Sequence, residues 1–169
     1  MPRTRFLAPV LTLALAACGS ELPSDPLAVL DAAQFSQVGH DRPFKAECNL
    51  RIQPPTVLSP GVIRQIDAGD CQALHLGTST LVSDKVINLA AGTQTTQITF
   101  TAANGDLLHA AGTGTNVMVA PGIVQFTADM TFAGGTGRFA HASGRATIRG
   151  QANLAEARSA TVMEGFILY

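Results

Sequence analysis

The segment Pro43-Phe-Lys-Ala-Glu-Cys-Asn-Leu-Arg-Ile-Gln53 decides the fold class of this chain. Its apolar residues stand at every second position from Phe44 to Ile52, and the residues between them are polar or charged. This period of two predicts a strand with one buried and one solvated face. The same alternation recurs in Val124–Phe132 and Ala142–Gly150, so the chain is expected to be mainly β.

Short turn signals separate the expected strands. Ser59-Pro60-Gly61, Asn104-Gly105 and Pro121-Gly122 are typical of tight connections between antiparallel strands. Strands are expected at 44–52, from 62, and at 80–89, 93–102, 107–116, 124–132, 142–151 and 158–169. About eight such strands favour a closed antiparallel β-barrel, which has no free edges. A two-sheet β-sandwich is the alternative.

Residues 1–17 predict a signal peptide, because Arg3 and Arg5 precede an apolar run that is too short to span a bilayer. The next feature, Leu15-Ala16-Ala17-Cys18, resembles the lipobox of bacterial lipoproteins. The resemblance implies cleavage before Cys18, diacylglycerol on its sulfur and an acylated amine. Two or three acyl chains hold a protein stably on a bilayer. An ordinary secretory signal with a chance cysteine is the alternative.

The residues after Cys18 suggest a location and a domain boundary. Gly19 and Ser20 follow without an aspartate, which resembles lipoproteins passed to the outer membrane of a Gram-negative cell and facing the periplasm. Residues 18–26 are expected to be the lipidated cysteine and a tether, and 27–169 a single barrel domain. Asp25 as an N-cap and Pro26 at the first helical position predict a short helix before the strands.

Composition limits the partners. Removal of residues 1–17 leaves nine basic against twelve acidic residues, a net charge of −3, which argues against nucleic acid. The chain has no Trp and one Tyr, so it lacks platforms for stacking bases or sugars. No cofactor is expected, and the partners expected are a lipid bilayer and either a small hydrophobic ligand or a protein.

Cys48 and Cys71 remain as an even pair in an oxidising compartment, which predicts a disulfide. A hairpin centred near residues 59 and 60 places the two cysteines opposite each other. However, the apolar parity of the second strand puts Cys71 on the wrong face, so a bulge at Gly69-Asp70 is expected to correct it. Two free thiols or half of a metal site are the alternatives, although His75 has no partner at ligand spacing.

The glycine-rich segment Phe132-Ala-Gly-Gly-Thr-Gly-Arg-Phe-Ala-His-Ala-Ser-Gly144 resembles a recurrent turn of the allene oxide cyclase and dirigent protein superfamily. There a Gly-Gly-Thr/Ser-Gly-x-Phe loop joins two strands and leads into Ala-x-Gly. The resemblance implies an eight-stranded barrel but transfers no reaction. In this turn, Gly134, Gly135 and Gly137 permit unusual backbone, and Phe139 is expected to plug the barrel end.

Candidate chemistry is sparse. The histidines, His40, His75, His109 and His141, have no metal-ligand spacing, so no metal is expected. His75 and His109 are the candidates for polar groups in the lumen. Asp129 and Asp106 are expected to be solvated. For Arg138, a structural role in satisfying turn carbonyls is favoured over anion binding.

These observations predict a membrane-anchored lipoprotein that binds a small apolar ligand or a protein partner and is not an enzyme. No catalytic residue can be assigned. The alternatives are an isomerase or cyclase that confines an apolar substrate, or a purely structural envelope protein whose barrel is filled by its own side chains. The size and polarity of the lumen should distinguish these functions.

Overall fold

The structure, a computed structural model, describes residues 41–169. The expected signal peptide, Cys18, the tether and the short helix lie outside the described residues. Within the described part, no helix is long and apolar enough to cross a bilayer.

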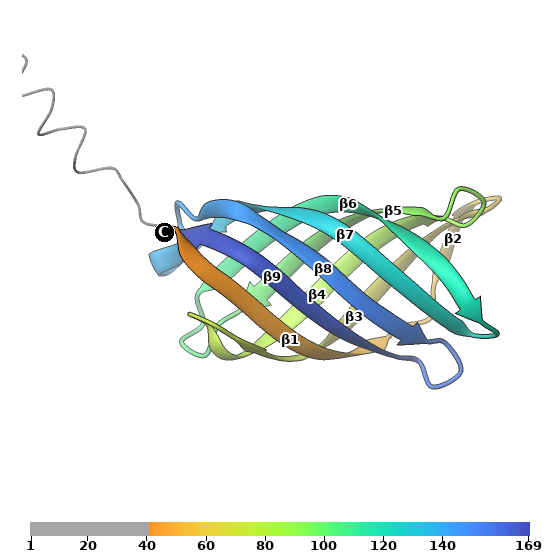
Figure 1. The fold of residues 1–169 in the computed structure, drawn as a ribbon, viewed down its shortest axis with the longest axis horizontal. Helices are drawn as coiled ribbons and strands as arrows, with labels where there is room; N and C mark the ends of the chain where they lie inside the picture. Colours follow the sequence, from red (N-terminus) through yellow and green to blue (C-terminus); the bar gives the residue numbers. More distant parts are fainter. Residues whose placement is uncertain (1–40) are drawn as a thin grey trace, which may run out of the picture. The chain divides into compact units, whose positions relative to one another are not determined.

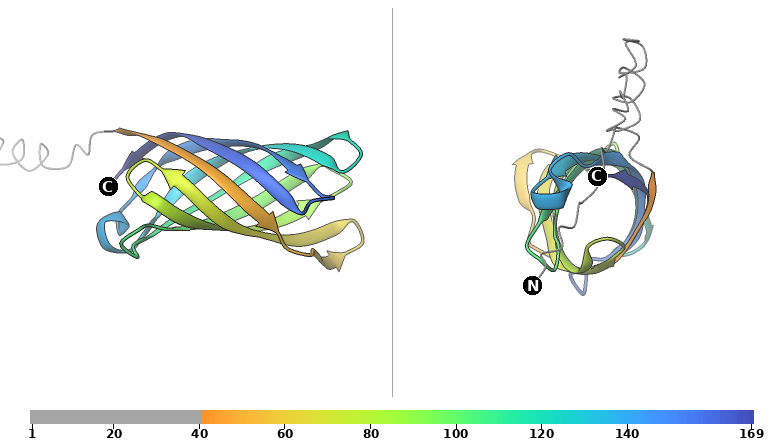
Figure 2. Two further views of the ribbon diagram at one scale, coloured as in Figure 1. Left: turned by 90° about the horizontal axis from the view of Figure 1, so that it is seen from below. Right: turned by 90° about the vertical axis from the view of Figure 1, so that its left-hand side faces the viewer.

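Nine antiparallel strands form one sheet (Figure 1). They are β1 (Arg42–Ile52), β2 (Thr56–Ser59), β3 (Val62–Ala73), β4 (Gly77–Asn88), β5 (Thr93–Thr101), β6 (Leu107–Ala120), β7 (Ile123–Gly135), β8 (Ser143–Asn153) and β9 (Arg158–Leu168). From β3 to β9 each strand pairs with the next, and β1 pairs with both β9 and β3. The eight long strands therefore close into a barrel (Figure 2), as predicted, and the sandwich alternative is wrong. The short β2 pairs with β3 outside the ring.

Alternation along each strand fills the barrel. In β1 the buried residues are Phe44, Ala46, Cys48 and Leu50, whereas the residues between them are exposed. β7 buries Ala128, Met130 and Phe132, and β8 buries Ala146, Ile148 and Ala152. Several strands extend beyond the expected bounds: β4 begins at Gly77, β6 continues to Ala120, and β7 continues to Gly135.

The barrel has two different ends, which lie at opposite sides of Figure 1. The plugged end carries the turns 74–76 and 102–106, the short 3₁₀ helix η1 (Gly137–Phe139) and the C-terminus. The hairpin end carries β2 and the turns 60–61, 89–92, 121–122 and 154–157. These two names are kept below.

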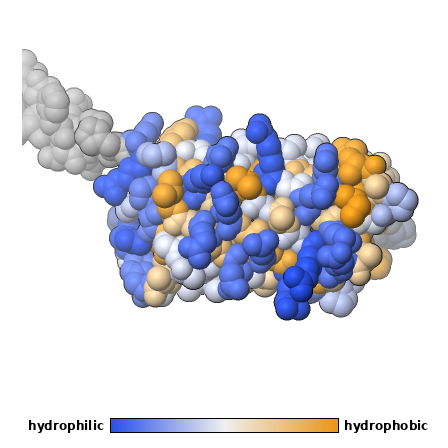
Figure 3. Space-filling view, turned by 60° about the horizontal axis from the view of Figure 1, so that its bottom comes forward, coloured by the Kyte–Doolittle hydropathy of each residue, from blue (hydrophilic) through white to orange (hydrophobic). Residues whose placement is uncertain are grey.

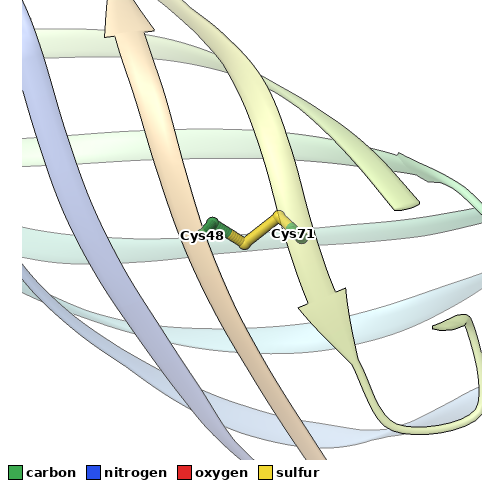
Figure 4. The surroundings of a disulfide bond; sticks show 2 residues. All are labelled: Cys48 and Cys71. Carbon is green, nitrogen blue, oxygen red and sulfur yellow. A yellow bond between two sulfur atoms is a disulfide. The ribbon is translucent and has the colours of Figure 1, made fainter. Parts of the chain in front are cut away.

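The predicted disulfide between Cys48 and Cys71 is confirmed (Figure 4). The two residues are paired directly across β1 and β3, with their Cα atoms 4.1 Å apart. The bond joins the two strands whose pairing completes the ring, and both cysteines are buried in the core. It therefore locks the closure of the barrel.

The expected bulge at Gly69-Asp70 is wrong. Pairing of β3 with β1 and with β4 continues without a register shift. The inward residues of β3 are instead the odd-numbered ones, so the buried Gln65 and Asp67 share the face of Cys71. The sequence pattern misled because the outer face of β3 carries Val62, Ile66 and Ala68, while polar side chains point into the barrel.

Candidate functional site

Apolar side chains fill the half of the lumen nearer the plugged end. Phe44 lies at the centre of this packing, with its ring centroid 4.8 Å from that of Phe132 and 6.0 Å from that of Phe100. Leu81, Leu108 and Met163 are also fully buried in the core. Edge-to-face aromatic contacts of this kind stabilise a close-packed interior, so this half resembles a protein core.

Polar side chains line the other half. Lys85 on β4 forms a buried ion pair with Asp67 on β3, and Gln65 Nε2 donates a hydrogen bond of 3.0 Å to Asp67 Oδ1. The Lys85 ammonium also lies 5.6 Å from the ring centroid of Phe126. Since a buried charge needs a partner and hydrogen bonds, these contacts make a charge-neutral cluster.

A small cavity adjoins this cluster, with a volume of about 20 Å³. Its lining includes Asp67, Ser83, Lys85, Thr96 and Phe126. Thr96 Oγ1 is buried and has no hydrogen-bond partner among the described residues. This space holds roughly one water molecule, which could satisfy that hydroxyl, but it is far smaller than the several hundred Å³ of a typical ligand pocket.

The residues expected in the lumen lie elsewhere. His109 is paired with Thr99 and stands between the inward-facing Leu108 and Ala110, so its side chain is on the outer wall; its Nδ1 lies 3.2 Å from Thr99 Oγ1. His75 occupies the turn between β3 and β4, where Nε2 lies 2.9 Å from the carbonyl oxygen of Pro43. The prediction that both histidines lie in the lumen is therefore wrong. His75 lies in a turn, and His109 is on the outward face of its strand.

The glycine-rich turn closes the plugged end. Phe139 is completely buried, with its ring centroid 5.0 Å from that of Tyr169. Gly134 and Gly137 have positive φ, and a side chain on Gly137 would collide with the Asp106 carboxylate. Gly135 is not in this region of φ but lies against the carbonyl of Leu107.

Arg138 in this turn acts on neighbouring backbone. Its guanidinium donates a hydrogen bond to the carbonyl oxygen of His75 and lies 4.9 Å from the ring centroid of Phe139. Its backbone N–H donates to Asp106 Oδ2 at 3.4 Å. These contacts tie the turn between β7 and β8 to two other turns, which is the structural role favoured for Arg138.

The remaining polar candidates do not converge. Asp129 is exposed on the outer wall, where Thr147 Oγ1 donates a hydrogen bond of 3.1 Å to its carboxylate. His141 is exposed beside η1. No group of three or more His, Cys, Asp or Glu side chains among residues 41–169 could hold a metal ion.

The outer wall has several shallow grooves. Two of these grooves, of about 660 and 680 Å³, run over β3–β7 and β6–β9 and share Thr115 and Thr127 in their linings. Threonines and valines form most of the first groove. Neither of these two grooves brings together groups that could serve as acid, base and nucleophile, so both are surfaces for contact.

Comparisons with other proteins add no function. No family model matches the chain, and neither a curated protein nor a solved structure matches it. The likeness of the glycine-rich turn to allene oxide cyclases and dirigent proteins therefore stays a prediction, because a barrel alone identifies no superfamily.

Sequence reasoning missed the polar cluster of Gln65, Asp67 and Lys85. The parity of Cys71 contained the signal, since counting back by two from a buried cysteine places Asp67 and Gln65 in the lumen. This parity was set aside because polar residues of a strand were assumed to face solvent.

Proposed function

We propose that this chain is a lipid-anchored structural protein of the bacterial cell envelope, whose barrel works through its outer surface. The observation that carries the proposal is the filled lumen, in which the cavity beside Lys85 and Asp67 has a volume of about 20 Å³. The Leu15–Cys18 motif supports the anchor, and Gly19-Ser20 supports a place at the outer membrane facing the periplasm.

The filled lumen also argues against the two other functions considered, binding of a small apolar ligand and isomerisation of a substrate. A binder of small apolar molecules needs an empty apolar chamber. The apolar half of the lumen, nearer the plugged end, is instead occupied by Phe44, Phe100 and Phe132. An isomerase needs a polar group beside a substrate-sized space, whereas Asp67 and Lys85 are bound to each other. Contact with a membrane or a protein partner requires neither.

Native mass spectrometry of the mature protein, extracted from membranes, tests the proposal directly. We expect the mass of the chain from Cys18 with its acyl groups and one disulfide, and no stoichiometric small molecule. A Phe100→Ala variant serves as the matched control, because the apolar void it creates should take up small apolar compounds. A small molecule bound stoichiometrically to the unaltered protein would overturn the filled-barrel proposal.

The anchor is tested separately with Cys18→Ser. We expect the acyl mass to disappear in this variant and the protein to lose lipid labelling, while the Cys48–Cys71 disulfide persists. An unacylated Cys18 in the unaltered protein, with the signal peptide removed, would instead support an ordinary secreted protein.

A further inference from the structure

Exposed aliphatic side chains gather at the hairpin end of the barrel. They form what we call the apolar rim: Val57, Leu58, Leu89, Val117, Met118, Val119 and Leu154. Figure 3 shows apolar surface concentrated at this end, whereas hydrophilic side chains cover most of the wall in that view. Val57 is 71% exposed and Met118 64% exposed. Such a concentration of exposed apolar residues is typical of a contact surface.

The connections at this end carry almost no charge. No Asp, Glu, Lys or Arg occurs between Gln53 and Ile63, and Asp106 is the only one between Val86 and Ala128. Asp106 lies in a turn at the plugged end. Of the turns at the hairpin end, 154–157 alone contains a charged residue, Glu156.

We infer that the apolar rim rests on the surface of a phospholipid bilayer, with its aliphatic side chains among the lipid headgroups and the upper acyl chains. The rim belongs to four separate connections around one end of the barrel, so a flat surface can touch all of them together. It contains only Val, Leu and Met. Trp, Tyr and Arg, which dominate the binding energy of protein interfaces, are missing from these seven residues, and six of the seven are Val or Leu, which are under-represented among such hot spots.

The length of the chain before the barrel allows this contact. The inference rests on the proposed function for the anchor at Cys18, and Asp41 follows Cys18 by 23 positions in the sequence. A chain of that length spans at most about 80 Å. The longest strand has 14 residues, and strands of that length, tilted as in a barrel, give a height of about 35 Å. The hairpin end can therefore reach the bilayer that holds Cys18.

The lipid anchor strengthens the contact between the rim and the bilayer, and charged residues on the wall limit how deeply the barrel enters. An anchor raises the effective concentration of the rim at the bilayer, so a weak apolar contact suffices. The outer wall carries the Arg64–Asp84 ion pair and the exposed Arg51, Arg149 and Arg158 close to this end. Burying those charges in lipid is costly, so only the rim is expected to enter.

Site-specific fluorescence quenching tests the inference on the mature protein in phosphatidylethanolamine and phosphatidylglycerol vesicles. With Cys18 acylated and Cys48 bonded to Cys71, an added cysteine is the only free thiol. A polarity-sensitive dye on Leu58→Cys or Met118→Cys should show a blue shift and be quenched by brominated lipid. The same dye on Leu74→Cys, an exposed leucine at the plugged end that is 49% exposed, should show neither change.

A second variant guards against an effect of the label. Val117→Ser, Met118→Ser and Val119→Ser combined should abolish the quenching at position 58, and Leu74→Ser should leave it unchanged. Equal quenching at both ends, or none at the rim, would overturn the inference. So would energy transfer between labelled copies without lipid quenching, which would indicate a dimer. The intact mass of the same sample measures the acylation of Cys18 independently. A protein that lacks the anchor can therefore be distinguished from an anchored protein whose rim does not contact lipid.

Discussion

The two ends of this barrel have opposite distributions of polar and apolar side chains between their outer surface and their interior. At the plugged end, charged groups such as Asp106 and Arg138 lie outside, and Phe139 and Leu76 are buried within. At the hairpin end, aliphatic residues are exposed on the rim, and the ion pair of Asp67 and Lys85 lies inside. One end is therefore built as a closed core, and the other presents an apolar surface over a polar interior.

This difference separates stability from function. Residues of the buried core hold the fold, and their truncation leaves cavities or lost contacts. Residues of the apolar rim are exposed, so their replacement should change what the protein touches and leave the fold intact. The predictions below test that division.

The largest effect is expected at the plug. Phe139→Ala should lower the free energy of unfolding by about 3–5 kcal/mol, because a large buried ring is replaced by a cavity. The matched control at the other end is Leu89→Ala, at an exposed side chain, which should change stability by no more than about 0.5 kcal/mol. Urea unfolding of both variants gives the comparison. Equal losses would show that the two ends contribute alike.

Removal of the disulfide should have the next largest effect. The bond joins residues 23 positions apart, and replacing both cysteines by alanine should cost about 3 kcal/mol in the chain-entropy model. Denaturant unfolding with and without reductant measures it. Reductant should destabilise the unaltered protein and leave the double variant unchanged; a further loss in the variant would point to another cause.

Breaking the internal ion pair should have a smaller effect. Lys85→Met leaves Asp67 buried with Gln65 as its remaining donor, and we expect a loss of about 2 kcal/mol. That is below the roughly 3–5 kcal/mol typical of a buried pair, because Gln65 still satisfies the carboxylate. Asp67→Leu combined with Lys85→Met should recover most of the loss. A double variant no more stable than Lys85→Met would show that the cluster does more than neutralise charge.

How far the sequence predicts this molecule depends on which face of a strand is apolar. β1, β7 and β8 could be predicted because their buried faces are apolar and their outer faces polar. The strand from residue 62 was also predicted, but its inward face was not, because Asp67 is buried and its partner Lys85 lies 18 residues away in the sequence. The sequence around either residue gives no sign of this ion pair.

The apolar rim was also beyond local prediction. The strand expected at 107–116 stops short of Val117, Met118 and Val119, and the exposure of these residues depends on where β6 ends relative to its neighbours. β6 pairs with β5 only up to Thr115, whereas its pairing with β7 continues to Ala120. The final residues of β6 therefore extend past β5, and only the three-dimensional register reveals that they are uncovered.

The smallest expected effect concerns the ion pair on the wall near the rim. Arg64 Nε donates a hydrogen bond of 2.9 Å to Asp84 Oδ1. This hydrogen bond, aided by the guanidinium charge and opposed by partial burial, lowers the pKa of the Asp84 carboxyl. Because that pKa is lower in the folded protein than its unfolded value of about 3.9, the pair stabilises fully above that pH. Its contribution is lost as pH falls through the folded pKa.

Thermal unfolding of the unaltered protein and of Asp84→Asn from pH 7 to pH 2.5 measures this contribution. At pH 7 the variant should unfold at a slightly lower temperature, since exposed pairs stabilise weakly, and the two transitions should converge in acid. Arg64→Gln should give the same small loss at pH 7 and add nothing to Asp84→Asn, because either change removes the same ion pair. A pH-independent difference would assign the effect to packing. Arg64 and Asp84 would then stabilise this part of the wall through side-chain contact and not through their charges, in contrast to the buried pair of Asp67 and Lys85.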